Sequence, residues 1–251
     1  MTILFIFVLG LIVGSFLNAV IHRLHSGESV VSDRSRCVHC HHVLTSADLI
    51  PIFSFVWLGG KCRYCQKPIS WQYPIIELTT AVTIVLLAQN FEFRISNFEF
   101  WYQVVFASTL IVIGVFDFKH YLILDRVVYP ALGLAIVWSI VNGHLVNSLL
   151  GAITISGFFA LQYFISRGRW IGFGDVKFGL FLGMLFGVKL GLTMLFISYL
   201  LGAFVGLGLI LAGRKNLGSR LPFGSFLAIS AIITMLYGPA LLGWYLGLIG
   251  L

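Results

Sequence analysis

Charged residues are scarce in this sequence. Only 10% of its 251 residues are charged, against about 25% in a soluble domain, whereas 59% are hydrophobic and the mean hydropathy is +0.99. This balance excludes a soluble globular protein and predicts a polytopic membrane protein whose apolar surface contacts membrane lipid. A net charge of +7 would suggest a nucleic-acid partner for a soluble protein. Here the basic residues sort to one side of the membrane, so we expect no nucleic-acid partner.

The sequence also lacks a basic segment ahead of its first apolar run. A secretory signal peptide begins with positive charges, but here the apolar run follows directly after Met1 and Thr2. Residues 2–21 are therefore interpreted as an uncleaved first transmembrane helix. Internal repeats and low-complexity linkers are absent too, which argues against the inverted-repeat architecture of many transporters.

The apolar runs predict an all-α fold of about eight transmembrane helices, with a small polar insert between the first two. Three domains are expected: the first helix at 1–21, the insert at 22–73 and a transmembrane domain at 74–251. The break between the sixth and seventh helices, at residues 187–189, is the least marked. The predicted helices cover residues 2–21, 75–90, 100–116, 127–141, 147–166, 178–188, 190–212 and 224–249.

The distribution of Lys and Arg predicts the orientation in the membrane. Eight spans place both termini on one side, and only Arg94 and Lys189 of the 16 basic residues fall in that set of connections. The positive-inside rule then places both termini outside and the other connections in the cytoplasm. The cytoplasmic set is Arg23, Arg34, Arg36, Lys61, Arg63, Lys67, Lys119, Arg126, Arg167, Arg169, Lys177, Arg214, Lys215 and Arg220.

The insert holds all four cysteines in two Cys-x-x-Cys pairs. This spacing is typical of a structural zinc site, in which two turns present thiolates to one tetrahedral ion. Two disulfides or a redox pair are the alternatives. A cytoplasmic insert disfavours stable disulfides, and a redox motif would leave one pair unexplained. The predicted ligands are Cys37, Cys40, Cys62 and Cys65.

Zinc would stabilise the insert, because about 50 residues cannot build a large core. His39, His41 and His42 lie beside the first pair of cysteines. With four thiolates available, we expect these histidines to be solvated or to support the ligands rather than to bind the metal.

The segment from Gly172 to Lys177, Gly-Phe-Gly-Asp-Val-Lys, stands between two apolar runs. Gly172 and Gly174 let the backbone turn tightly and approach another chain closely. Asp175 follows at the mouth of a membrane helix. A carboxylate is costly there, so Asp175 is a candidate functional residue.

A second aspartate is expected on the same side of the membrane. Asp117 ends the third predicted helix, where the helix dipole disfavours an anion, so its position calls for another reason. Two predicted helices separate Asp117 from Asp175. One goes out and the next comes back, so topology alone returns both aspartates to the cytoplasmic boundary.

Two close carboxylates in a low-dielectric site cannot both ionise readily. The ionised one can take a proton from water while the neutral one donates to a carbonyl oxygen or a leaving amine. The pair therefore predicts general acid–base hydrolysis without a covalent intermediate. In the alternative interpretation, each aspartate only caps a helix or pairs with Lys119 or Lys177.

Two other acids have structural interpretations. Asp125 stands just before the fourth predicted helix and is well placed to cap it. Glu77 lies in the first turn of the second predicted helix, where a carboxylate is favoured. A role for Glu77 at a ligand-binding site near the membrane surface is the alternative.

Several motifs together resemble the bacterial type IV prepilin peptidases, which belong to the Gly-x-Gly-Asp intramembrane aspartyl proteases. The resemblance covers most of the chain. Its motifs are Gly-x-Gly-Asp at 172–175 continuing to Lys177, the first-helix run at 14–24, the paired knuckles with Gly60, Tyr73, Pro74 and Glu77, Asp117 with Asp125 eight residues on, and Pro222-Phe223-Gly224 with Leu227 and Ala228.

The resemblance implies a bacterial inner-membrane enzyme with two activities. It cleaves the leader peptides of prepilins and pseudopilins on the cytoplasmic side, and it methylates the new N-terminus with S-adenosylmethionine. Asp117 and Asp175 match the catalytic aspartates. No Gly-rich fingerprint for S-adenosylmethionine is visible, so the methyltransferase activity rests on the resemblance, and its site is unassigned, with Glu77 as a candidate.

The sequence departs from the family pattern at three positions where proline is common. His25, Leu124 and Ser225 stand there instead. These changes concern loop conformation and remove no catalytic group. Two other functions remain as alternatives. A proton-relay transporter would carry carboxylates near the bilayer midplane, and a zinc-domain scaffold would bind prepilins without cutting them.

Overall fold

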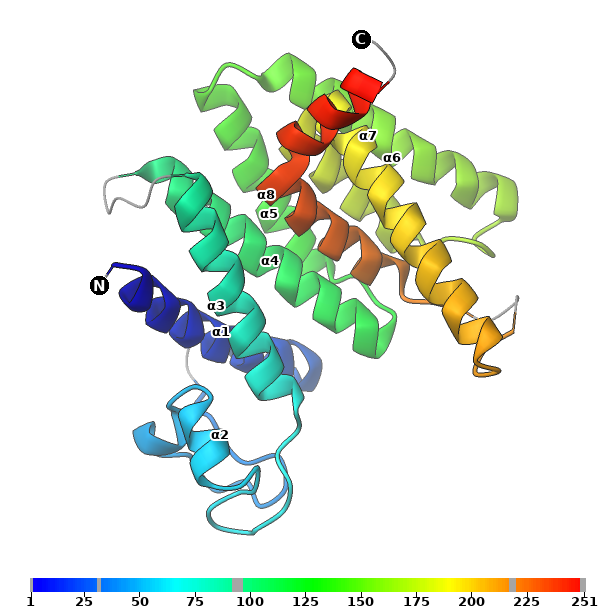
Figure 1. Ribbon diagram of the computed structural model, residues 1–251. Coiled ribbons are helices and arrows are strands. Elements are labelled where there is room, and N and C mark those ends of the chain that lie inside the picture. Colours follow the sequence, from blue (N-terminus) through cyan, green and yellow to red (C-terminus); the bar gives the residue numbers. More distant parts are fainter. Residues whose placement is uncertain (1, 31–32, 92–96, 217–219, 249–251) are drawn as a thin grey trace. The chain divides into compact units, whose positions relative to one another are not determined.

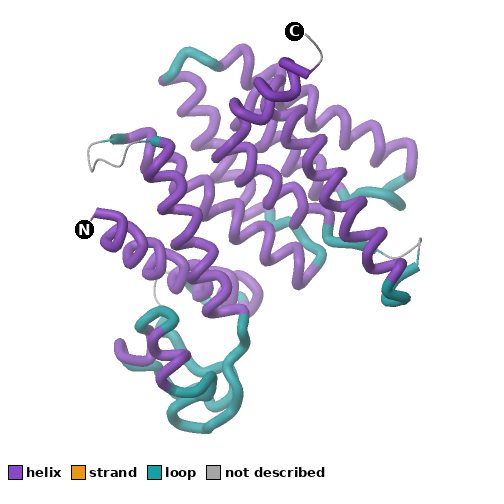
Figure 2. Tube along the Cα trace, viewed as in Figure 1, coloured by secondary structure: helices purple, strands orange, loops and turns teal. Residues whose placement is uncertain are grey.

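The chain folds into helices joined by loops. The computed structural model describes residues 2–30, 33–91, 97–216 and 220–248, and Figure 2 shows no strand among them. Arg94, one of the two basic residues predicted outside, lies beyond these ranges. The elements are α1 (Thr2–Ser26), the 3₁₀ helix η1 (Ser46–Leu49), α2 (Phe53–Trp57), α3 (Gln72–Asn90), α4 (Phe98–His120), α5 (Asp125–Val141), α6 (Leu145–Ser166), α7 (Phe173–Leu211) and α8 (Phe223–Leu248).

The helices form two compact units. The first is Met1–Val112 and the second is Ile113–Leu251, so the boundary falls within α4. The predicted division at 1–21, 22–73 and 74–251 follows membrane topology and stays a prediction.

In the first unit α1 packs along α3 (Figure 1). Gly10 faces the backbone of Ala81, and Gly14 faces the backbone of Glu77. Small residues let membrane helices approach closely, because association there depends on packing rather than on expulsion of water.

The polar insert begins later than predicted, because α1 continues to Ser26. Arg23 lies in this last turn and is buried. Its guanidinium donates to the carbonyl oxygens of Val30 at 2.7 Å and Asp33 at 2.5 Å. The side chain thus holds the start of the insert against the helix end, where a cation is also favoured by the helix dipole.

In the second unit α7 is broken at Gly187, which confirms the predicted break at 187–189. Gly187 has φ 68° and ψ −166°, a conformation that essentially only glycine adopts. Both halves of α7 run along α6 away from this point. Asn147 of α6 lies at Gly187, whereas Tyr163 contacts Phe173 of the first half and Gln162 bonds Tyr199 of the second. The two halves therefore form a hairpin.

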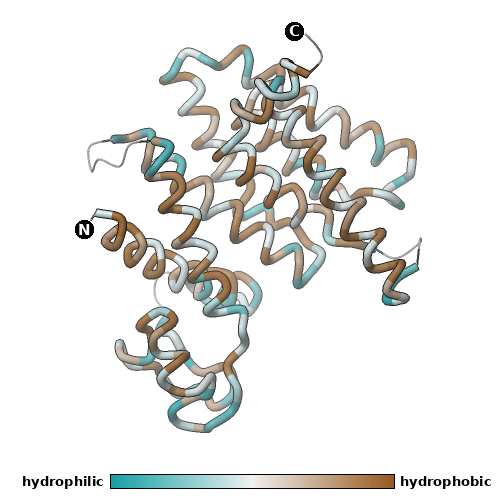
Figure 3. The backbone as a smooth tube through the Cα atoms, viewed as in Figure 1, coloured by the Kyte–Doolittle hydropathy of each residue, from teal (hydrophilic) through white to brown (hydrophobic). Residues whose placement is uncertain are grey.

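Within the part of the chain that the structure describes, five helices are long and apolar enough to cross a membrane: α1, α4, α6, α7 and α8. Their apolar runs are visible in Figure 3. The predicted eight spans are not confirmed. Helices α3 and α5, with 19 and 17 residues, are not among the five, and a span takes about 20 predominantly apolar residues.

Candidate active site

Asp117 is held by the start of another helix. Its side chain lies in the last turn of α4, and the residue is only 5% exposed. Oδ2 accepts a hydrogen bond from the backbone N–H of Ser225 at 2.8 Å, and the Ser225 hydroxyl lies 3.2 Å away. Ser225 is in the first turn of α8, where backbone N–H groups lack helical partners and the dipole favours an anion. The α8 N-terminus thus supplies the stabilisation that the end of α4 cannot.

Asp175 is held by the start of its own helix. It lies in the first turn of α7 and is 9% exposed. Its Oδ2 accepts a hydrogen bond from the backbone N–H of Gly172, the N-cap residue, at 3.1 Å. The capping interaction considered as an alternative interpretation is therefore present, and it occupies only one of the two carboxylate oxygens.

The two aspartates share one buried site. Both side chains are buried in the second unit. Ile123, in the loop between α4 and α5, contacts two glycines. One is Gly174, which precedes Asp175 in the chain, and the other is Gly224, which lies against the Asp117 side chain. A Cβ added at Gly174 or Gly224 would come within 3.1 Å or 3.0 Å of Ile123. The structure therefore brings the predicted pair together. The catalytic role of the pair remains a prediction.

Lys177 pairs with Asp125, not with either member of the buried pair. Its Nζ donates to both Asp125 oxygens at 2.8 Å and lies over the rings of Tyr129 and Phe173. The predicted capping role of Asp125 is wrong. Leu124 is the N-cap of α5, and the nearby ammonium gives the Asp125 carboxylate a stronger, charge-assisted partner. This pair ties α5 to α7.

The four cysteines of the insert lie together. Their sulfurs are all within 4.8 Å of one another, and those of Cys37 and Cys65 are 3.8 Å apart. Four thiolates bound to zinc at about 2.3 Å stand about 3.8 Å apart at the corners of a tetrahedron. The cluster therefore fits the ligand set that the sequence predicts.

The two knuckles have the same backbone geometry. The first cysteine of each, Cys37 or Cys62, exchanges backbone hydrogen bonds of 2.9–3.0 Å with residues four and five positions on. The fourth residue along, His41 or Gln66, has a positive φ of 57° or 58°. Repeating one turn presents sulfurs symmetrically to a shared point, as a tetrahedral site requires.

The thiols differ in ionisation before any cation binds. Burial works to raise the pKa of Cys37, but the N–H groups of Cys40 and His39 outweigh it and lower that pKa to about 7. The Lys67 N–H works to lower the pKa of Cys65, but burial and the other thiols raise it to about 11. A bound cation would offset the repulsion between neighbouring thiolates and so favour the ionised form of all four cysteines.

Asp48 connects η1 to the second knuckle. Its carboxylate accepts hydrogen bonds from the Thr45 hydroxyl at 2.8 Å and from Arg63 Nε at 2.7 Å. Desolvation works to raise the pKa of Asp48, but these bonds outweigh it and lower it. His42 lies against the Tyr64 ring in a tilted arrangement, with centroids 3.7 Å apart, so it contacts the knuckle without adding to the four sulfurs.

Glu77 fixes the insert to α3. Its Oε2 accepts a hydrogen bond from the backbone N–H of Ile52 at 2.7 Å. Ile52 has φ 60° and ψ −49°, and the Phe53 N–H donates to the Pro51 carbonyl at 2.5 Å, which together define a strained γ-turn. The buried carboxylate is therefore engaged in holding a strained backbone, which fits a tether better than a cofactor ligand.

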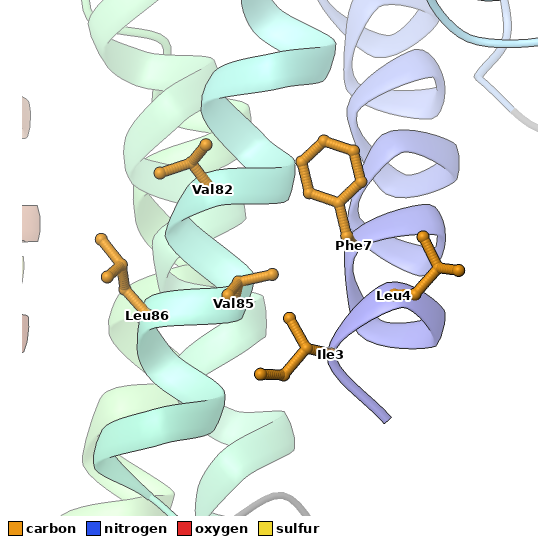
Figure 4. Close-up of a pocket in the computed structure, with 6 residues that line it drawn as sticks. All are labelled: Ile3, Leu4, Phe7, Val82, Val85 and Leu86. Atoms are coloured by element: carbon orange, nitrogen blue, oxygen red, sulfur yellow. The ribbon is translucent and has the colours of Figure 1, made fainter. Parts of the chain in front are cut away.

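An apolar pocket lies elsewhere in the first unit, between α1 and α3 (Figure 4). All its side chains are hydrocarbon, so it offers no group for acid–base chemistry or polar recognition. Its lining residues are Ile3, Leu4, Phe7, Val82, Val85 and Leu86.

Two family models match the chain. The Bacterial Peptidase A24 N-terminal domain covers residues 8–91, and the Type IV leader peptidase family covers residues 104–207. A prepilin leader peptidase/N-methyltransferase of Bacillus subtilis is 37% identical, over 98% of each chain. This chain belongs to the type IV leader peptidase family. Similar enzymes are 31% identical in Dichelobacter nodosus, over 94% of this chain and 92% of that one, and 29% identical in Aeromonas hydrophila, over 96% and 92%. No solved structure matches the chain.

The leader peptidase match contains both buried aspartates, whereas the four cysteines and Glu77 fall within the N-terminal match. Both candidate centres therefore lie within the matched ranges. Sequence reasoning missed the contacts that surround Asp117. Ser225 and Gly224 belong to the 222–228 motif, but the motif gave no sign that they reach Asp117. Ile123 carried no signal of its own.

Proposed function

We propose that this protein cleaves the leader peptides of prepilins and pseudopilins with Asp117 and Asp175, and then methylates the new N-terminus. The observation that carries the proposal is the buried aspartate pair, within a chain 37% identical to a prepilin leader peptidase/N-methyltransferase. Prepilins are therefore its expected substrates, in a multi-pass protein of the bacterial inner membrane. The cytoplasmic position of the pair and the external termini rest on the Lys and Arg distribution.

The chemistry follows from two adjacent carboxylates sharing a proton. The ionised carboxylate takes a proton from water as the water oxygen bonds to the scissile carbonyl carbon, and the protonated carboxyl donates its proton to the carbonyl oxygen. When the tetrahedral intermediate collapses, the C–N bond breaks and the departing amine receives a proton from the pair.

The structure offers a set of ligands that fits zinc, whereas the site for S-adenosylmethionine is unassigned. The sulfur spacing fits zinc, which Cys37, Cys40, Cys62 and Cys65 would hold, fixing the fold of the insert. S-adenosylmethionine would supply the methyl group for the new amine. Glu77 accepts a hydrogen bond from the Ile52 N–H, its part in binding this cofactor stays a prediction, and we derive no step of methyl transfer through it.

The experiment is cleavage of a prepilin by purified protein in detergent. Asp117→Asn and Asp175→Asn are each expected to lower the cleavage rate by roughly a thousandfold, because either change removes one acid–base group. Asp33→Asn, at a carboxylate of the insert that accepts a hydrogen bond from the Ser29 N–H, serves as the control. Unchanged cleavage by either variant of the pair would overturn the assignment. Mass spectrometry of the mature N-terminus tests for the added methyl group.

A further inference from the structure

Helix α2 of the insert presents large apolar side chains on its surface. Phe53, Val56 and Trp57 are 58%, 70% and 75% exposed, and the rings of Phe53 and Trp57 stack with their centroids 5.8 Å apart. These three residues are called the aromatic patch below. A cluster of exposed apolar residues of this kind marks a surface that contacts a partner or a membrane.

Two hydrogen bonds place α2 level with the apolar part of α1. Glu77 of α3 accepts from the Ile52 N–H, directly before α2. Because helical side chains lean toward the helix N-terminus, Ile52 lies near the first turn of α3. That turn is bound to α1, since the Asn18 amide donates to the Tyr73 carbonyl at 3.0 Å. Asn18 precedes the exposed His22 by four residues, about 6 Å of helix, so α2 starts beside the apolar run of α1 and not beyond its polar end.

The aromatic patch continues into one face of α3. Trp71, at the start of that helix, contacts Phe55 of α2 with ring centroids 5.0 Å apart. Spacings of three and four residues put four exposed apolar side chains of this helix on one face: Trp71, Ile75, Leu78 and Val82. Exposed apolar side chains on a helix that packs along a membrane span contact lipid, so the aromatic patch lies at the edge of a lipid-facing surface.

We propose that the aromatic patch inserts into the membrane at the boundary between phospholipid headgroups and acyl chains, and so anchors the insert to the bilayer. Tryptophan is enriched at this depth, because its ring is apolar while its indole N–H can stay hydrated. Trp57 and Trp71 both lie on this surface and are both exposed. The short helix α2 thus lies in the plane of the interface. The proposal concerns how the insert is held and is independent of the peptidase function.

Tryptophan quenching tests the proposal in the full-length protein, reconstituted into phosphatidylcholine vesicles. Trp57→Phe keeps an aromatic ring and removes one of the six tryptophans, so the difference between its emission and that of the wild type reports on Trp57. We expect aqueous acrylamide to quench Trp57 roughly three- to tenfold less than a solvated tryptophan, because its ring would lie below the aqueous boundary. A phospholipid with a nitroxide near the headgroup should quench Trp57 more than one with a nitroxide at the acyl terminus.

Val38→Trp, made in the Trp57→Phe protein, is the matched control. Val38 is an exposed apolar residue of the first knuckle, and a tryptophan there should be open to acrylamide and insensitive to the nitroxide lipids. Both variants should keep the wild-type Tm. Equal acrylamide quenching at positions 57 and 38 overturns the proposal, as does stronger quenching of Trp57 by the deep nitroxide. Shielding of Trp57 that appears only when a prepilin is added also overturns it, because the aromatic patch would then bind protein.

A second measurement needs no variant. Wild-type protein in the same vesicles is photolabelled with a phospholipid that carries a diazirine near its headgroup, and the labelled peptides are mapped by mass spectrometry. Peptides that contain residues 53–57 should carry the label, whereas those that contain residues 37–42 should not. Absence of label from residues 53–57 overturns the proposal. Neither measurement requires cleavage, so failure of the proposed peptidase function would leave both results unchanged.

Discussion

At position 224 any side chain would meet Asp117. A Cβ there would lie 3.0 Å from the Asp117 Cγ and equally close to Ile123 Cδ1. Contacts this short force the carboxylate or the loop to move, because packed interiors have little free space. We expect Gly224→Ala to lower kcat for leader cleavage by roughly 10- to 100-fold, measured as initial rates in detergent.

The control for this prediction is Gly243→Ala, in the same helix, where an added Cβ meets nothing within 4 Å. It should cleave at the wild-type rate. If Gly224→Ala does so as well, the position of Asp117 tolerates displacement, and the argument from its fixed geometry fails.

The residues around Asp117 also show what a sequence can predict at this scale. Asp117 was identifiable because a carboxylate at the C-terminal end of a helix has no favourable interaction of its own. Its partner Ser225 could not be identified from the sequence, because the hydrogen bond joins residues 108 positions apart and uses a backbone N–H. Every residue except proline carries such a group, so no residue type signals it.

Among the elements, α7 depends on one glycine for its hairpin. Gly187 combines a φ of 68° with a site already filled by the Asn147 side chain. Gly187→Ala should reduce the free energy of unfolding by roughly 1–3 kcal/mol, and more if Asn147 cannot move. The measurement is thermal unfolding in detergent. Gly157→Ala in α6, with open space around it, should leave Tm unchanged, and equal Tm values for the two variants would contradict the prediction.

The tether between Glu77 and Ile52 gives a second prediction for an element. Glu77→Ala leaves the Ile52 N–H without its acceptor, so we expect faster proteolysis and faster hydrogen exchange in residues 46–57. Glu77→Gln retains an oxygen acceptor and should stay close to the wild type.

Glu99→Ala, at an exposed residue in the first turn of α4, is the control for this tether. Equal protection of residues 46–57 in Glu77→Ala and wild-type protein would show that the γ-turn does not need the carboxylate.

Element boundaries were predicted unevenly. The break at Gly187 was readable because a glycine and Lys189 interrupt an apolar run. The length of α1 was not, because Arg23 is polar in sequence but buried by its bonds to two carbonyl oxygens. Asp125 was misread because its partner Lys177 lies 52 residues away. In both cases the role of the residue depends on a partner that the neighbouring sequence does not reveal.

For the whole molecule, the clearest prediction is its metal content. We expect one zinc ion per chain by elemental analysis. Cys62→Ser should reduce the zinc content well below one and lower Tm, because the metal contributes folding energy to a small insert. His39→Ala should retain one zinc. Zinc-free protein with unchanged Tm and activity would contradict a structural role.

At the same scale, composition sufficed to predict a helical membrane protein, and the spacing of the cysteines predicted that their sulfurs lie together. The roles of the cysteines and of the aspartates stay predictions. The number of membrane crossings was not settled by hydropathy, because α3 and α5 are not among the helices long and apolar enough to span a membrane. Which helix termini would stabilise the aspartates was also beyond sequence patterns, since that depends on how α4, α7 and α8 pack in the second unit.

The position of the cysteines along the chain has a consequence for biosynthesis. All four lie between residues 37 and 65, ahead of α4 and α7, which carry the aspartates. A ribosome therefore completes the cysteine-bearing insert before it has made either of the two buried aspartates. Because chains fold from the N-terminus as they are synthesised, the insert can fold, and bind zinc as predicted, before the proposed catalytic pair exists. On the proposed function, each new molecule becomes able to cut only after α7 has been made.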